Sequence, residues 1–183
     1  RVLFRSLVAD AVREATHADV ALLNGGGFRG GRLYPAGTTL TRKDVLGELP
    51  FLNKAYVLSL KGADILQALE QGFTGAEDEI GRFPQVSGMT VRADLTRPAG
   101  RRVVSITVGG KPLQRGKTYT LATNDYLAHG GDGYSALRSG KVLRGEQDAD
   151  LVTTIAISYL ERHKTVSPHV EGRVIVARAH PPH

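Results

Sequence analysis

The chain has 183 residues, 41% of them hydrophobic and 23% charged, a balance typical of one globular domain. It contains no cysteine, which excludes disulfide bonds, thiolate metal sites and cysteine nucleophiles. The formal net charge of +6 comes from scattered basic residues without a stripe or zinc spacing, so we expect no nucleic-acid partner.

No apolar run approaches the roughly 20 residues of a membrane helix, so no membrane segment is expected. Apolar residues recur with helical spacing from Leu7 to Ala15, and Ser6 is expected to cap this first helix, which ends near His17. The further predicted elements are a strand at 19–24, a helix at 41–49, a strand at 54–60, a helix at 62–73, strands at 88–95, 101–110 and 118–124, and a helix at 151–163.

Local signals mark several boundaries between these elements. Thr41 with Asp44 opens the short helix at 41–49, and Pro50 stops it. Gly109 and Gly110 predict a turn after the strand at 101–110. The order of elements predicts an α+β fold, a single domain over residues 7–176 with one main mixed β-sheet flanked by helices.

Two glycine clusters carry the candidate chemistry. TNDYLAHGGDGY, from Thr123 to Tyr134, places one aspartate, Asp132, in a glycine turn between aromatic residues. Glycine lets a ligand approach the main chain closely, and a carboxylate accepts hydrogen bonds from vicinal hydroxyls. LLNGGGFRG adds Asn24, an amide that both donates and accepts, and Arg29, a planar fork suited to phosphate. Together the two clusters indicate a nucleotide pocket.

These motifs also fit other interpretations. NGGGFRG satisfies the dinucleotide pattern G-x-G-x-x-G, but GRLYPAGTTLT cannot form the helix that must hold the pyrophosphate. No Gly-Lys-Ser/Thr follows, which excludes a Walker loop. Lone aromatic residues are usually core, Asp132 can simply close its turn, and Arg29 can be an ordinary surface arginine. His129 lies near Asp132, but no serine elbow or cysteine accompanies it, so no catalytic residue is expected.

Five motifs in order resemble the C-terminal, substrate-binding domain of the 5′-nucleotidase and UDP-sugar hydrolase family. They are NGGGFR at 24–29, LPF at 49–51, FPQVSGM at 83–89, TNDYLAHGGDGY at 123–134 and PHVEGRV at 168–174. The resemblance implies that Phe51 and Tyr126 sandwich the base, that Asp132 binds the ribose, that Asn24 contacts the base or nearby atoms, and that Arg29 lies near the phosphate. The expected substrate-binding residues are Asn24, Gly26, Arg29, Phe51, Tyr126, Gly131 and Asp132.

The resemblance also implies what lies outside this chain. Hydrolysis of nucleoside 5′-phosphates or UDP-sugars would require two divalent metal ions of the zinc or manganese type in an N-terminal metallophosphatase domain, the expected partner in cis. The six histidines show no metal-ligand spacing, so this fragment is expected to bind a nucleoside or nucleotide, to hold no metal or cofactor and to be inactive alone. A periplasmic, secreted or cell-surface location is implied by the family.

Some assignments stay open at this point. RVLFRS at 1–6 lacks the residues that the family carries there, so it is expected to be non-native or the end of a truncated segment, and 177–183 is expected to be a frayed tail. The functional alternatives are the same domain of a 2′,3′-cyclic-nucleotide phosphodiesterase or a thiosulfohydrolase, or a non-catalytic nucleoside-binding or adhesion module. Both aromatic residues are retained, which argues against the thiosulfohydrolase.

Overall fold

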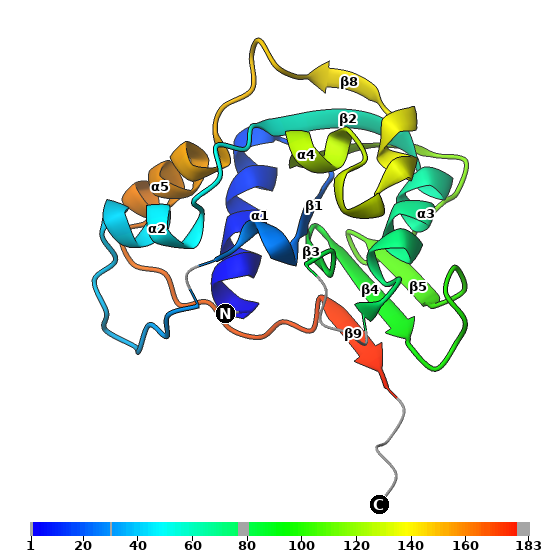
Figure 1. The fold of residues 1–183 in the computed structure, drawn as a ribbon, viewed down its shortest axis with the longest axis horizontal. Helices are drawn as coiled ribbons and strands as arrows, with labels where there is room; N and C mark the ends of the chain where they lie inside the picture. Colours follow the sequence, from blue (N-terminus) through cyan, green and yellow to red (C-terminus); the bar gives the residue numbers. More distant parts are fainter. Residues whose placement is uncertain (1, 30, 77–80, 179–183) are drawn as a thin grey trace, which may run out of the picture.

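The computed structural model describes residues 2–29, 31–76 and 81–178 (Figure 1). Its helices are α1 (Val2–Thr16), α2 (Arg42–Glu48), α3 (Gly62–Gly72), α4 (Asp125–Ala128) and α5 (Val152–His163), with 3₁₀ turns η1 (Gly25–Gly27), η3 (Gly131–Gly133) and η4 (Ser135–Ser139). Its strands are β1 (Val20–Asn24), β2 (Ala55–Lys61), β3 (Pro84–Ser87), β4 (Met89–Asp94), β5 (Val103–Val108), β6 (Lys111–Pro112), β7 (Thr118–Asn124), β8 (Lys141–Arg144) and β9 (Val174–Ala177).

The strands form two mixed sheets. The five-stranded sheet has the order β3-β1-β7-β2-β8, in which only β1 and β7 run parallel, and the four-stranded sheet has the order β6-β5-β4-β9. The α+β class with a mixed main sheet flanked by helices is confirmed, and the four-stranded sheet is an addition that the sequence analysis did not separate. Gly88, with φ of +74°, lies between β3 and β4, and its left-handed backbone allows the chain to pass from the first sheet to the second.

Alternating side chains of the five-stranded sheet build one core on each of its faces. One face buries Leu22, Leu58 and Leu121 against α3 and the second sheet, and the other buries Leu23 and Ala122 against α1, α2 and α5. Figure 1 shows this layering, with α2 and α5 on the side of the sheet opposite α3, β4 and β5. The central strands are therefore packed on both faces, and this packing supports the residues at their ends.

Most predicted elements are confirmed, and their local signals work as expected. At the start of α2 the Thr41 hydroxyl accepts from the Asp44 N–H while the Asp44 carboxylate accepts from the Thr41 N–H, a capping box. Gly109 and Gly110 form the turn between β5 and β6 with φ of +55° and +79°. Among the described residues, no helix combines the length and apolar character needed to cross a membrane.

The first helix begins earlier than expected. Ser6 is not its cap, because α1 starts at Val2 and residues 2–6 form its first turn. Phe4 packs edge-on against Phe28 with ring centroids 6.4 Å apart, and this tertiary contact supports the extra turn. At the other end, Ala177 is the last residue of β9, whereas most of the tail expected to fray, 179–183, lies outside the described residues.

The C-terminal motif PHVEGRV has a structural role. Arg173 donates two hydrogen bonds of 2.7 Å to the carboxylate of Asp10 on α1 and further bonds to Glu171. Burial alone would lower the pKa of Arg173, but bonding to the two carboxylates raises it above its usual range. Ser87, at the end of β3, donates to the same Asp10 carboxylate. The motif therefore ties the segment before β9 to α1 and to the five-stranded sheet.

Candidate functional site

The residues of the two glycine clusters meet at one edge of the five-stranded sheet. Asn24 ends β1 and Asn124 ends β7, and because these strands are parallel neighbours their carboxyl ends lie side by side. Ala55, at the start of the antiparallel β2, pairs with Asn124, so the loop that carries Phe51 reaches the same edge. In Figure 1 this edge lies where η1, shown in blue, and α4, shown in yellow-green, follow their strands.

A chain of hydrogen bonds crosses this edge through two buried asparagines. The Asn124 side chain accepts from the Leu127 N–H at 2.8 Å, which caps α4, and its amide donates to Asn24 Oδ1 at 3.1 Å. Asn24 in turn donates to Asp132 Oδ2 at 2.7 Å. Sequence reasoning missed Asn124, although an asparagine just before a short helix is a recognisable cap signal.

Asp132 is held by the aromatic residue six positions before it. The Tyr126 hydroxyl donates to Asp132 Oδ1 at 2.9 Å and accepts from the Asp132 N–H at 3.2 Å. Asp132 has a left-handed φ of +52°, an uncommon conformation that these bonds stabilise. A Cβ on Gly131 would lie 2.6 Å from three atoms of the Tyr126 ring, so only glycine lets the main chain pack against that ring.

Phe51 and Tyr126 are both accessible. Their exposed fractions are 42% and 48%, although large aromatic side chains are normally buried. The Arg29 guanidinium lies 5.3 Å from the centroid of the Phe51 ring, and the Arg29 N–H donates to the Glu48 carbonyl. A cavity of about 20 Å³ beside Phe51 has room for little more than a water molecule, so a base would have to use the exposed ring surface.

Gly26 has a packing role in the structure. Its N–H donates to the Gly81 carbonyl at 2.6 Å, and a Cβ on Gly26 would lie 3.2 Å from the Gly81 Cα. Glycine at this position therefore lets the loop after β1 pack closely against the segment that leads into β3. A role for Gly26 in ligand binding stays a prediction.

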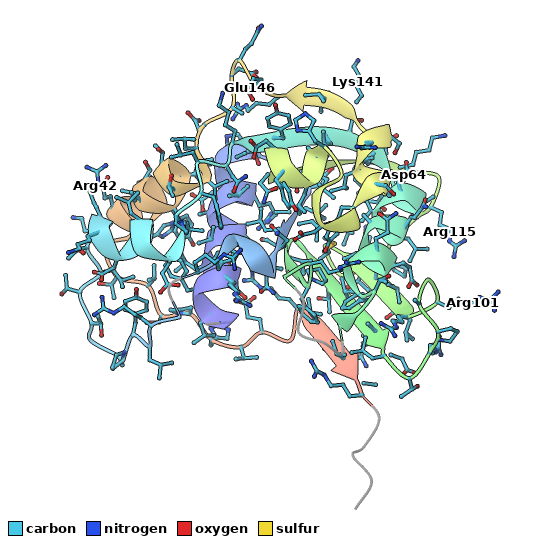
Figure 2. All side chains as sticks on the ribbon, viewed as in Figure 1. Arg42, Asp64, Arg101, Arg115, Lys141 and Glu146 are labelled. Carbon is cyan, nitrogen blue, oxygen red and sulfur yellow. The ribbon has the colours of Figure 1, made fainter. Side chains whose placement is uncertain are left out.

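A larger hollow lies elsewhere on the molecule. It has a volume of about 810 Å³ and lies between α3 and β5, with Arg101 and Arg115 among its lining residues. Figure 2 shows both arginines extending outward on that side of the molecule. None of the residues that line this hollow is aromatic, so it offers no ring on which a base could stack. Side-chain chemistry, and not volume, therefore makes the sheet edge the candidate site.

Comparison with known proteins agrees with the motifs at the sheet edge. Residues 2–139 match the family model described as 5′-nucleotidase, C-terminal domain. The chain belongs to this family. The trifunctional nucleotide phosphoesterase YfkN of Bacillus subtilis (strain 168) is 37% identical over 168 residues, which cover 88% of this chain and 11% of that protein.

Two further relatives of the 5′-nucleotidase family cover almost the whole chain. A snake venom 5′-nucleotidase of Gloydius brevicauda is 33% identical over 183 residues, which cover 95% of this chain and 31% of that protein. The crystal structure of a 5′-nucleotidase precursor from Thermus thermophilus has a TM-score of 0.87 and 36% identity, covering 97% of this chain and 36% of that chain. The chain thus spans from about a tenth to about a third of the length of these relatives.

The described part of this 5′-nucleotidase domain offers no ligand set for the metals that the family implies. Among residues 2–29, 31–76 and 81–178, no group of three or more histidine, aspartate and glutamate side chains is arranged to hold a metal ion. His129 packs its ring against Tyr56, with centroids 5.5 Å apart.

An ion pair just before β2 supports the candidate site. Lys54, just before β2, donates to Glu146 Oε1 at 2.5 Å, and the Tyr56 hydroxyl donates to Glu146 Oε2 at 3.2 Å. Figure 2 shows Glu146 in the segment that follows β8. Hydrogen bonds from Lys54 and then Tyr56 lower the pKa of Glu146, and the bond to Glu146 raises the pKa of Lys54. Asp125 accepts from the Lys54 N–H and from Asn53, which links this pair to α4.

This ion pair predicts an acid-sensitive contribution to stability. Because the pKa of Glu146 is lower in the folded chain than in the unfolded chain, its contribution is present above the unfolded value of about 4.3 and is lost as pH falls through the folded value. We expect Glu146→Gln to lower the thermal midpoint near neutral pH, and the difference from the wild type to shrink as the pH is lowered through this range.

Circular dichroism melts at a series of pH values measure this difference. Glu161→Gln is the matched control, since the Glu161 carboxylate is 4.0 Å from Arg42 Nε in an exposed pair that contributes little. A Glu146→Gln difference that stays constant down to about pH 3, below the ordinary glutamate pKa, would contradict the assignment.

Proposed function

We propose that this domain binds the nucleoside part of a nucleotide and fixes its phosphate for hydrolysis by a 5′-nucleotidase-type enzyme. The observation that supports the proposal is that Tyr126 and Asn24 bond the Asp132 carboxylate while Tyr126 and Phe51, which borders the same sheet edge, are half-exposed. Flat apolar rings, paired with an acceptor for vicinal hydroxyls, suit a ligand that joins a base to a ribose.

Each side chain has a distinct part in the proposed binding. Phe51 and Tyr126 stack on the base, which tolerates several bases because each base has a π-face. Asp132 accepts hydrogen bonds from the ribose hydroxyls, and Asn24 holds Asp132 while its remaining amide capacity serves the base or nearby atoms. Arg29, whose guanidinium lies over Phe51, supplies positive charge for the phosphate.

In the proposed enzyme this domain contributes proximity. Two divalent metal ions of the N-terminal domain would generate the nucleophile and stabilise the transferring group. Holding the nucleoside fixes the scissile phosphate beside that centre and removes much of the entropic cost of the encounter. We therefore expect the 183-residue chain to bind nucleotides with micromolar to millimolar affinity and to show no phosphatase activity.

The same proposal covers location and substrate range. Export to the periplasm, the cell surface or the medium is supported by the venom enzyme among the relatives. Nucleoside 5′-phosphates are favoured as substrates because the proposed site has rings for a base and a carboxylate for a ribose. UDP-sugars also contain a base and a ribose. A 2′,3′-cyclic-nucleotide phosphodiesterase is the second candidate, since the Bacillus relative is named as a trifunctional nucleotide phosphoesterase.

The stacking role of Phe51 gives the direct test of this proposal. Phe51→Ala is expected to weaken AMP binding by about 1 to 3 kcal/mol, roughly 5- to 150-fold, because one stacking surface is lost. Phe51→Trp keeps a stacking surface and is expected to retain most of the affinity. Isothermal titration of AMP, GMP and UMP into the three proteins measures the effect. Equal affinity in the alanine variant and the wild type would refute the site.

A further inference from the structure

We propose that the hydroxyl of Tyr126 makes this site selective for ribose by holding the Asp132 carboxylate ready for two vicinal hydroxyls. This role rests on the proposed nucleoside function, and it separates the Tyr126 hydroxyl from the Tyr126 ring. The ring of Tyr126 would stack on the base, and its hydroxyl would position Asp132. Tyr126 is then a positioning residue as well as a contact residue.

Three hydrogen bonds fix Asp132 before any ligand arrives. Tyr126 donates to Oδ1 at 2.9 Å, Asn24 donates to Oδ2 at 2.7 Å, and the Asp132 N–H donates back to the Tyr126 hydroxyl at 3.2 Å. The backbone of Asp132 is in the left-handed region, with φ of +52°, between two glycines. The carboxylate therefore has a partner on each oxygen, and its residue is bonded through the main chain too.

The partners leave a defined acceptor capacity. A carboxylate has about four acceptor sites, two on each oxygen, and one on each oxygen is used by a protein donor. One acceptor site on each oxygen therefore remains for a ligand. The 2′ and 3′ hydroxyls of a ribose are two adjacent donors, one for each carboxylate oxygen, whereas a sugar without them leaves these acceptors unused.

The Tyr126 hydroxyl is engaged on both sides. It gives its proton to Asp132 and accepts from the Asp132 N–H, so it acts on the carboxylate and is not a free donor for a ligand. Without this hydroxyl, Oδ1 would lose its protein donor and the carboxylate would be held by Asn24 alone. Preorganisation reduces the cost of ordering on binding, so its loss should weaken the contact to the hydroxyls and spare the stacking.

Tyr126→Phe separates these two tasks because it removes the hydroxyl and keeps the ring. We would titrate adenosine and 2′,3′-dideoxyadenosine into the wild-type chain and the variant by calorimetry. The wild type is expected to prefer adenosine by about tenfold or more, the value of a hydrogen bond to a charged acceptor. In the variant this preference should fall by about three- to tenfold, with dideoxyadenosine affinity within about twofold of the wild type.

Tyr119→Phe is the matched control. Tyr119 is on the same strand as Asn124 but at its opposite end, and its hydroxyl likewise accepts from a main-chain N–H, that of Gln114 at 3.0 Å. This control should leave the preference for adenosine unchanged. An unchanged preference in Tyr126→Phe, or an equal loss of both ligands, would overturn the selectivity role. Failure of the wild type to bind either ligand would instead overturn the nucleoside function on which the inference rests.

Discussion

Replacing Asp132 by glycine is expected to weaken AMP binding by about 100-fold, or about 3 kcal/mol, while the fold stays intact. The loss is large because Asp132 supplies the acceptors for both ribose hydroxyls. Glycine is the substitution to use, since it adopts the observed φ of +52° without the strain that alanine would add. Calorimetric titration of AMP measures the effect.

Asp132→Asn is the companion variant. Asparagine also tolerates the left-handed backbone, but its amide offers one acceptor oxygen in place of two and carries no charge. We expect an intermediate loss of AMP affinity and an unchanged thermal midpoint. Wild-type affinity in the glycine variant would show that the aspartate only closes its turn, the simpler interpretation of its position between glycines.

Replacing Tyr134 by alanine is expected to reduce the free energy of unfolding by about 3 to 5 kcal/mol, the range for deleting a large buried aromatic ring. Tyr134 is fully buried directly after the turn that carries Asp132, and a Cβ on Gly72 of α3 would lie 2.2 Å from its hydroxyl. That hydroxyl donates to the Arg82 carbonyl at 2.6 Å. The cavity would therefore open beneath the candidate site, so AMP binding should weaken too.

Tyr134→Phe isolates the hydrogen bond from the ring. Burial raises the pKa of Tyr134 above its usual range, so the phenol remains a donor across the pH range in which the chain is studied. Its loss should cost about 1 to 2 kcal/mol, including the unpaired Arg82 carbonyl. Urea unfolding of both variants measures the two costs. Equal destabilisation by the alanine and phenylalanine variants would contradict the packing role of the ring.

The elements that sequence predicts well are those with a buried face. β1, β2, β7 and α3 have side chains in the two cores, so their apolar spacing is regular. Sequence reasoning did not separate β3, β6, β8 and β9 as strands, because they are two to four residues long and, apart from β3, largely exposed. The division into two sheets depends on pairings between distant segments, which spacing along the chain does not encode.

The residues proposed for the site were named from the sequence, but the hydrogen bonds that join them were not. The family resemblance implied a shared site for Phe51, Tyr126 and Asp132, which stays a prediction; in the structure Tyr126 bonds Asp132, and β2 and β7, which border their segments, pair at one edge. The bond between Asn24 and Asn124 joins side chains separated by 100 residues, so it required the parallel pairing of β1 and β7. The contact of Arg29 with Phe51 was likewise unexpected, because a cation near an aromatic ring leaves no spacing signal.

A crystal structure of the chain with AMP tests the central claim most directly. The account predicts the adenine ring between Phe51 and Tyr126 and the 2′ and 3′ hydroxyls within hydrogen-bond distance of the Asp132 carboxylate. The Tyr126 bond to Asp132 should persist in that complex. Adenine bound instead in the hollow between α3 and β5, with the two rings uncovered, would contradict the account.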